Sequence, residues 1–225
     1  MEDRKRFRIT DERVLEYLEG LLQPYDGIAG QIGSGRTRHE LPTADTVTLK
    51  LLEIFIRILN PGKILEIGTS EGRSAIVMAG AMIDGTIDTI ESDYDVLEKA
   101  RANFDKAGVS NIVNIIAGDA NDVLSNLNKE YDLIFIDAAK GQYTNYYDKC
   151  SEMVSEGGVI FADNVLYRGM VAGGAKVNRR QQLLVRRLGE FLEKAVNDKR
   201  FVTDVLPVGD GVCISYRKRE GNEKD

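Results

Sequence analysis

The sequence has very few of the side chains on which several common kinds of site depend. It contains one histidine, His39, and two cysteines, Cys150 and Cys213. A single histidine argues against a histidine-based triad or metal cluster. Two cysteines far apart in the chain are too few for a disulfide framework or a zinc site, so we expect buried thiols in a reducing cytoplasm.

Long apolar runs are also missing. No stretch of about 18 consecutive apolar residues occurs, so we expect no membrane-spanning helix and no membrane partner. Residues 1–8 lack the apolar segment of a secretory signal, which supports a cytoplasmic location. With 43% hydrophobic residues and only four prolines among 225 residues, the chain can bury a sizeable core. We expect one domain over residues 1–225, with an N-terminal extension of helix and loop at 1–40 and a frayed tail at 218–225.

Acidic residues are absent from one segment of an otherwise acidic chain. The net charge is −6, but residues 164–189 contain no Asp or Glu. A solvated helix face explains such a run more often than a polyanionic partner does, and the location of the segment must decide between the two. The basic residues of this segment are Arg168, Lys176, Arg179, Arg180, Arg186 and Arg187.

Apolar runs that alternate with helical patterns indicate the fold class. Short apolar runs predict strands at residues 63–67, 86–90, 113–117, 131–136 and 158–162. Helical spacing predicts helices at 14–22, from Thr43 or Asp45 to 58, and at 74–79, 94–107, 120–127, 144–153 and 179–197. The glycine-rich residues 28–37 are expected to form a loop. This alternation predicts an α/β fold, a doubly wound, Rossmann-like sheet with helices on both faces.

The end of the chain breaks the alternation. Two β-rich runs, 201–206 and 212–216, follow each other with only a short turn between them. Two strands joined in this way form a hairpin. We therefore expect a mostly parallel sheet with a reversed last strand.

The stretch from Lys63 to Ser74 combines a buried strand, a glycine turn and the start of a helix. Gly68 and Gly72 allow the chain to turn sharply and to approach a ligand, and the free N–H groups of the following helix point back at the loop. A G-x-x-x-G sequence alone is a weak signal, because many strand–helix junctions of this kind are only tight turns. A nucleotide-like ligand and a simple turn both stay open.

Polar residues follow each of the five predicted parallel strands. In an open parallel sheet, ligands bind at the carboxyl ends of the strands. Glu91 lies about twenty residues beyond the glycine turn, where a carboxylate can accept both hydroxyls of a ribose. Any single carboxylate could instead cap the following helix, but five polar strand ends together indicate a ligand site. These residues are Gly68, Thr69, Ser70, Glu91, Gly118, Asp119, Asp137, Lys140, Asp163 and Asn164.

Four of these residues form a set that a dinucleotide would leave unused, namely Asp137, Lys140, Asp163 and Asn164. If the strands before Asp137 and Asp163 are neighbours, about 4.8 Å apart, the two carboxylates meet at one edge of the crevice. Two carboxylates and an amide oxygen are hard ligands and favour Mg²⁺ over zinc. Lys140 could reach the same point, and a nearby divalent ion favours the neutral amine, which can accept a proton from a bound hydroxyl.

Together these motifs resemble one known enzyme family, the divalent-metal-dependent O-methyltransferases of the catechol and caffeoyl-CoA type, which use S-adenosylmethionine. The resemblance runs from about Leu41 to Arg217. It implies a seven-stranded sheet with the final strand reversed, and a homodimer. The motifs that carry it are Glu66-Ile-Gly-Thr-Ser-Glu-Gly72, Glu91, Ile136-Asp-Ala-Ala-Lys140, Ala162-Asp-Asn164 and Leu206-Pro-Val-Gly-Asp-Gly211.

By position, the resemblance implies that Lys140 is the base and that Asp137, Asp163 and Asn164 bind Mg²⁺ or another divalent cation. Arg73 stands where the family often has an aromatic residue. The residues that the resemblance implies for S-adenosylmethionine are Thr43, Gly68, Thr69, Ser70, Gly72, Ser74, Glu91, Asp119, Ala120 and Asp137.

Within the family, residues 136–143 and 163–172 are most similar to the bacterial tRNA 5-hydroxyuridine methyltransferases, which form 5-methoxyuridine. The 5-hydroxyl and O4 of that base form an oxygen pair like a catechol's, and arginines beside the site would meet phosphates of the anticodon loop. A small catechol-like or caffeoyl-CoA-like phenol is the alternative substrate, and a cofactor-binding protein without catalysis is a third interpretation. The implied substrate residues are Tyr143, Tyr167, Arg168, Arg179 and Arg180, with Tyr146 and Tyr147 as further stacking candidates, although the tyrosines could equally pack their helix.

Overall fold

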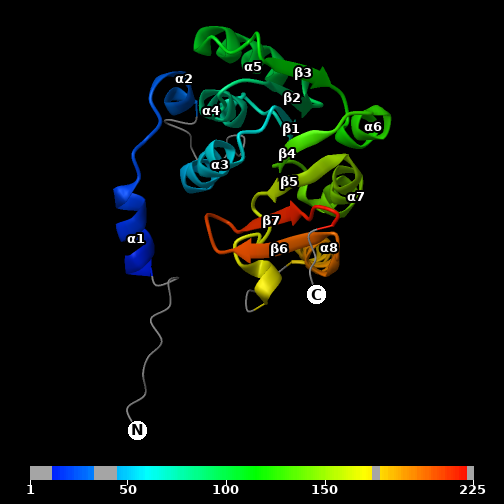
Figure 1. Cartoon of the computed structure of the whole chain (residues 1–225). Helices are drawn as coiled ribbons and strands as arrows, with labels where there is room; N and C mark the ends of the chain where they lie inside the picture. The colour runs from blue at the N-terminus through cyan, green and yellow to red at the C-terminus, as the bar shows by residue number, and fades with distance from the viewer. Residues whose placement is uncertain (1–11, 33–44, 174–177, 222–225) are drawn as a thin grey trace.

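A seven-stranded sheet forms the centre of the molecule (Figure 1). The computed structural model describes residues 12–32, 45–173 and 178–221. The strands lie side by side in the order β3-β2-β1-β4-β5-β7-β6. They are β1 (Lys63–Ile67), β2 (Thr86–Glu91), β3 (Val113–Ala117), β4 (Tyr131–Ile136), β5 (Val154–Ala162), β6 (Phe201–Leu206) and β7 (Val212–Arg217).

The strand directions follow the sequence prediction. Strands β1 to β5 are parallel to one another, whereas β7 runs antiparallel to both β5 and β6. The C-terminal hairpin and the reversed last strand are therefore confirmed. The strand order reverses between β1 and β4, which pair through Ile67 and Ile136 at their carboxyl ends. In open α/β sheets a ligand crevice forms at such a reversal.

Helices connect the strands and cover both faces of the sheet (Figure 1). None of the described helices is long and apolar enough to cross a membrane. The α-helices are α1 (Glu12–Leu21), α2 (Gly27–Gln31), α3 (Thr46–Leu59), α4 (Arg73–Ala81), α5 (Tyr94–Ala107), α6 (Ala120–Asn126), α7 (Tyr143–Met153) and α8 (Arg179–Asn197), with 3-10 turns η1 (Lys140–Gln142) and η2 (Met170–Ala172).

The prediction of a loop over residues 28–37 is wrong where the structure describes this segment, because α2 occupies its first part. Glycine costs a helix about 1 kcal/mol relative to alanine, which is why the segment resembles a loop. The helix lies against α4 and α5 and buries Ala29, with Ile32 buried just beyond it. This tertiary burial outweighs the low helix propensity. Residues 33–37 lie outside the described part of the chain.

Strand β5 also starts earlier than the strand predicted at 158–162. Val154 already pairs with Tyr131, and a register shift separates this pair from the next one, Leu133 with Val159. Gly157 lies within the shifted stretch with φ 81°. A glycine in a strand often marks a bulge, and here it allows pairing to continue across an irregular segment that the sequence pattern does not reveal.

The core lies in two layers, one on each face of the sheet. Helices α3, α4 and α5 contribute Leu52, Met78 and Phe104 to one layer. Helices α6, α7 and α8 form the other, with Tyr147 and Phe191 at its centre. Both faces of the parallel strands are therefore buried, as continuous apolar strands require.

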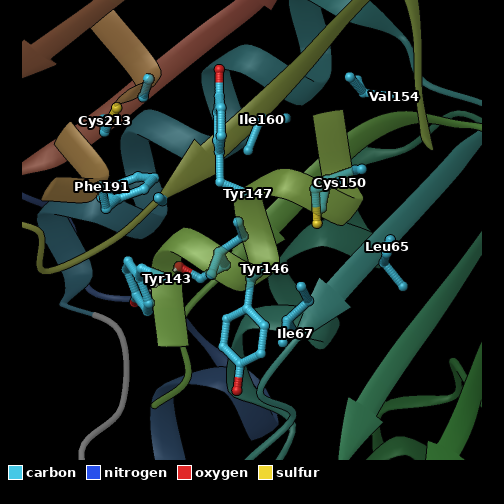
Figure 2. Packing of buried hydrophobic residues seen from close by; sticks show 14 of the residues in the cluster. Leu65, Ile67, Tyr143, Tyr146, Tyr147, Cys150, Val154, Ile160, Phe191 and Cys213 are labelled. Carbon is cyan, nitrogen blue, oxygen red and sulfur yellow. Dashed lines mark hydrogen bonds between the residues drawn. The ribbon is translucent and has the colours of Figure 1, made fainter. Parts of the chain in front are cut away.

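Figure 2 shows the layer under α7, where tyrosines project among side chains of the sheet and of α8. Cys150 of α7 and Cys213 of β7 belong to the same cluster and are buried free thiols. The prediction of buried thiols is thus confirmed.

Candidate active site

A cavity of about 330 Å³ lies at the carboxyl ends of β1, β2 and β4, where the strand order reverses. It gathers residues that are far apart in the sequence and that lie at the ends of strands or in the loops and helices that follow them. The sequence-predicted residues in its wall are Gly68, Thr69, Ser70, Ser74, Glu91, Gly118, Asp119, Ala120, Asp137 and Lys140.

Position 68 requires a glycine because the carboxyl ends of β1 and β4 approach each other closely. Its φ is 101°, and a Cβ at this position would lie 2.2 Å from the carbonyl oxygen of Asp137. The backbone N–H groups of Gly68 and Thr69 both donate to the carbonyl of Ile90, at 3.0 and 3.2 Å. The loop after β1 is therefore fixed between β2 and β4.

Gly72 is needed for a different reason. It is not among the residues that line the cavity, and its φ is 87°. A Cβ there would lie 2.4 Å from the ring of Phe104 in the core. Core packing at the start of α4, rather than ligand contact, explains this second glycine of the G-x-x-x-G sequence.

Glu91 is held by main-chain donors at the cavity wall. One carboxylate oxygen accepts from the backbone N–H of Ser70 at 3.0 Å, and the other from those of Ser92 and Asp93 at 2.8 and 3.1 Å. Each carboxylate oxygen has two acceptor positions, so Glu91 can still accept from a ligand. Asp119 caps α6 through the N–H of Asn121 at 2.8 Å, which supports the capping interpretation for this residue.

A buried polar network supports the cavity from beneath. Glu66 of β1 is fully buried and accepts hydrogen bonds from the hydroxyls of Ser74 and Thr89. Burial raises the pKa of Glu66 to about 8, against the opposing effect of these hydrogen bonds. Glu66 was not predicted as a site residue, although a carboxylate inside an apolar strand signals a special environment.

Asp137 and Asp163 follow neighbouring strands, as predicted. Ile136 and Ala162, the residues before them, are paired in the sheet. Asp163 is fully buried, and one oxygen, Oδ1, accepts from the Thr48 hydroxyl at 3.3 Å and from the Asn164 N–H at 2.6 Å. Burial, followed by the negative charge of Asp137, raises the pKa of Asp163 to about 7.

The second carboxylate oxygen of Asp163, Oδ2, is buried without a hydrogen-bond partner among the described residues. An isolated buried carboxylate oxygen is costly, and a bound cation removes that cost. Asn164 directs its amide nitrogen to Asp163 Oδ1 at 3.2 Å, which leaves its amide oxygen as a further hard donor. In the described part of the chain, no group of three His, Cys, Asp or Glu side chains could hold a metal ion, so the candidate donors are limited to the carboxylates of Asp137 and Asp163 and the amide oxygen of Asn164. This set fits a divalent ion of the Mg²⁺ type.

Lys140 lies at the rim of the cavity on η1. Its Nζ is 3.2 Å from Asp137 Oδ1, and the two side chains are 19% and 16% exposed. An amine and a carboxylate in this half-buried position can both face a bound ligand.

Comparison with known proteins now decides the family. A sequence model of the O-methyltransferase family matches residues 38–218. This chain belongs to the O-methyltransferase family. A caffeoyl-CoA O-methyltransferase of Stellaria longipes is 31% identical over 179 residues, which cover 75% of this chain and 73% of that protein.

Solved structures agree with this assignment. The SAH-bound methyltransferase PaMTH1 of Podospora anserina is 29% identical, with a TM-score of 0.80 over 92% of this chain and 94% of that one. TomG, an O-methyltransferase of Streptomyces achromogenes solved in complex with SAM, is 26% identical, with a TM-score of 0.79 over 97% of this chain and 100% of that one.

The tyrosines predicted to contact the substrate of the methyltransferase differ in whether they line the cavity. Tyr143 is fully buried and donates to the carbonyl of Asp163 at 2.9 Å, and its ring meets Phe191 edge to face. A fully buried ring has no free face on which a base could stack. The predicted stacking role is therefore wrong for Tyr143 and for Tyr147, whose rings pack in the core instead. Tyr146 is largely buried but does line the cavity.

The remaining substrate predictions lie on the segment after β5 and on α8. Tyr167 is half-buried, whereas Arg168 and Arg179 are exposed. Arg180 belongs to α8, but its side chain lies outside the described part, and so does Thr43, the remaining predicted cofactor residue.

Two arginines of the O-methyltransferase were not predicted as site residues. Arg73 lines the cavity and donates to the carbonyl of Ala29 at 3.1 Å and to the hydroxyl of Thr46 at 2.9 Å, so it ties α2 and the start of α3 to the cavity wall. Its departure from the family's aromatic residue was the available signal. Arg187 of α8 donates to the carbonyl of Gly141 at 3.3 Å, in the turn that carries Lys140.

Proposed function

We propose that this O-methyltransferase moves a methyl group from S-adenosylmethionine to a hydroxyl of a substrate that offers two neighbouring oxygens to a divalent metal ion. The observation that carries this proposal is the fully buried Asp163, whose Oδ2 lacks a partner among the described residues. It follows the strand next to that of Asp137, and Asp137 contacts Lys140. Asp137 and Lys140 line the cavity, whereas Asp163 and Asn164 follow the neighbouring strand and are not part of its lining, so the proposed metal would bind where these two strand ends adjoin.

The wall of the cavity would hold the cofactor. The loop from Gly68 to Ser74 would bind the methionine part, Glu91 the ribose, and Asp119 and Ala120 the adenine end. The relatives solved with SAM or SAH support S-adenosylmethionine as the cofactor. The carboxylate of Glu91 is already oriented by three backbone donors, so little ordering would be needed when ribose hydroxyls bind.

Asp137, Asp163 and Asn164 would hold Mg²⁺ or a similar ion, which when bound supplies Lewis acidity toward a chelated hydroxyl. Lys140 Nζ would accept the proton of that hydroxyl. S-adenosylmethionine, when bound, would supply the methyl group and leave as S-adenosylhomocysteine. The chain would contribute mainly by holding the acceptor oxygen in line with the methyl–sulfur bond and by excluding water.

For the acceptor we propose 5-hydroxyuridine at the wobble position of tRNA. Support comes from the segment without acidic residues, which begins at Asn164 and continues into α8. Arg187 of this segment reaches the turn of Lys140, so positive charge lies beside the site. Backbone phosphates of a single-stranded loop would bind there. The tRNA partner and the homodimer stay predictions.

A second candidate acceptor is a small phenol with two neighbouring hydroxyls. The observation that favours it is the name of the relatives, since proteins about 30% identical to this chain are caffeoyl-CoA O-methyltransferases. The same metal ligands and Lys140 would serve this reaction.

One experiment separates the two acceptors. The chain is incubated with Mg²⁺ and methyl-labelled S-adenosylmethionine, with 5-hydroxyuridine-containing tRNA in one arm and a caffeoyl-CoA or catechol acceptor in the other. We expect label in 5-methoxyuridine by nucleoside mass spectrometry. Label only in the phenol would select the second candidate, and label in neither acceptor would overturn the proposed function.

A further inference from the structure

The segment that follows β5, residues 164–170 and here called the β5 loop, has an unusual backbone. Asn164, Tyr167 and Arg168 have φ values of 55°, 48° and 56°. Left-handed conformations cost residues other than glycine about 1–2 kcal/mol each. Asn tolerates this region, but tyrosine and arginine have no side chain that favours it. Other contacts must therefore hold the loop.

Those contacts come from the turn between β6 and β7, residues 207–211, here called the hairpin turn. Three backbone N–H groups of the β5 loop donate to it. Val165 donates to the carbonyl of Gly211 and Leu166 to the carbonyl of Asp210, both at 2.9 Å. Arg168 donates to the carboxylate Oδ1 of Asp210. Asp210 thus accepts two of the three hydrogen bonds.

The hairpin turn is itself firmly placed. The N–H of Gly211 donates to the carbonyl of Val208 at 2.9 Å, and a Cβ on Gly211 would lie 2.3 Å from the side chain of Leu166. A Cβ on Gly209 would lie 2.8 Å from the hydroxyl of Thr48. The turn therefore fills the space between the β5 loop and α3.

Both neighbours of the turn touch the candidate metal site. The β5 loop begins with Asn164, directly after Asp163, and Thr48 of α3 donates to Asp163 Oδ1 at 3.3 Å. A shift of the hairpin turn would move both. In the sheet, β4 and β5 separate β7 and β6 from β1.

We propose that Asp210 is a positioning residue that holds the β5 loop in its left-handed conformation and so keeps Asn164 and the residues after it in place for metal and acceptor. This inference rests on the proposed function, because it gives the β5 loop a role in that reaction. It assigns the orientation of the loop to a carboxylate that does not touch the reacting atoms.

The test compares Asp210→Ala with Asp210→Asn, which keeps an acceptor oxygen in the same place. Asp204→Ala is the matched control, because Asp204 is an exposed carboxylate on the same hairpin that accepts from the N–H of Val205 at 2.8 Å. Four quantities are measured on the full chain: hydrogen exchange of residues 164–172 in saturating S-adenosylmethionine, the Kd of Mn²⁺, the Kd of S-adenosylmethionine, and the KM of the acceptor compared with its kcat.

We expect Asp210→Ala to speed exchange in residues 164–172 about tenfold and to raise the Kd of Mn²⁺ and the acceptor KM about tenfold, as loss of one charge-assisted hydrogen bond predicts. The Kd of S-adenosylmethionine should stay within about twofold. Asp210→Asn should stay within about threefold of the natural chain in every quantity, and Asp204→Ala should not differ from it.

Unchanged exchange in Asp210→Ala would overturn the inference, and so would Asp210→Asn behaving like Asp210→Ala. If Asp210→Ala does not bind S-adenosylmethionine, Asp210→Ser replaces it, and faster exchange spread over the whole sheet would count against a positioning role. The exchange measurement needs no acceptor. It therefore tests Asp210 even if the natural chain methylates neither proposed substrate, an outcome that would defeat only the proposed function.

Discussion

Burial governs the chemistry of Glu66 more than its hydrogen bonds do. Its carboxyl group lies within β1, fully buried, and bonds to two hydroxyls. Its pKa is nevertheless raised to about 8, because burial penalises the charged form. An unfolded chain releases this proton at pH values near 4.3. The folded chain therefore carries a proton at neutral pH that the unfolded chain lacks.

Glu66→Gln should remove a pH dependence of stability. A raised folded-state pKa means that the stabilisation from Glu66 is complete at low pH and is lost as the pH rises through 8. The free energy of unfolding of the variant minus that of the natural chain should therefore grow by about 1–3 kcal/mol from pH 5.5 to pH 8.5. Urea unfolding at these pH values measures it. Glu98→Gln, on the exposed face of α5, should show a constant difference, and a constant difference for Glu66→Gln would contradict burial as the cause.

Asp163→Asn tests the metal site with little change in side-chain volume. If Asp163 holds the ion, methyl transfer should fall about 100-fold or more, whereas the Kd of S-adenosylmethionine should stay within about twofold. Initial rates with labelled cofactor and calorimetric titration measure the two effects. Asp95→Asn on α5 is an exposed control. A fully active Asp163→Asn enzyme would remove the metal from the mechanism.

Sequence could predict some of these residues and not others. Asp137 and Asp163 were predictable because each follows an apolar strand, and parallel strands end at one edge. The direction of Tyr143 was not, since a tyrosine at the start of a helix can face the core or the ligand with the same spacing. Arg73 was visible only as a departure from a family pattern, because its contact with Ala29 joins segments that no local pattern connects.

At the scale of elements, the sheet was predictable from short apolar runs, while two details were not. Helix α2 forms in a glycine-rich stretch because it is buried against α4 and α5, which lie later in the chain. The first part of β5 pairs across a bulge at Gly157, where strand alternation is interrupted. In both cases tertiary contacts override local propensity.

Helix α8 offers a test of the acceptor at this scale. Arg179→Glu should raise the KM for tRNA about threefold to tenfold at low salt and reduce the salt dependence of binding by about one charge, because phosphate contacts release counterions. Turnover of a small phenol should change less than about twofold. Rates at several salt concentrations give both values, with Lys106→Glu on α5, on the opposite face of the sheet, as the control. An equal loss with both acceptors would argue against a tRNA contact at Arg179.

For the molecule as a whole, the reversal of strand order between β1 and β4 puts the proposed cofactor residues and the proposed metal donors on different strands of one sheet. The proposed cofactor residues lie at or after the ends of β1, β2 and β3, whereas the proposed metal donors follow β4 and β5. Asp137 is proposed for both sets; it lines the cavity and contacts Lys140. The two ligands should therefore bind to one folded unit through largely separate contacts.

This division predicts how ligands stabilise the chain against heat. S-adenosylmethionine at about 100 times its Kd should add about 2.7 kcal/mol, which corresponds to a rise in Tm of about 5–10 °C for a chain of this size. Mg²⁺ should add a further rise that EDTA reverses. In Asp163→Asn the cofactor should still raise the Tm whereas Mg²⁺ should not, because only the metal donors are changed. Scanning calorimetry of the natural chain and of Asp163→Asn, with and without each ligand, measures these Tm shifts. Loss of both shifts in the variant would show that Asp163 supports the whole cavity rather than the ion alone.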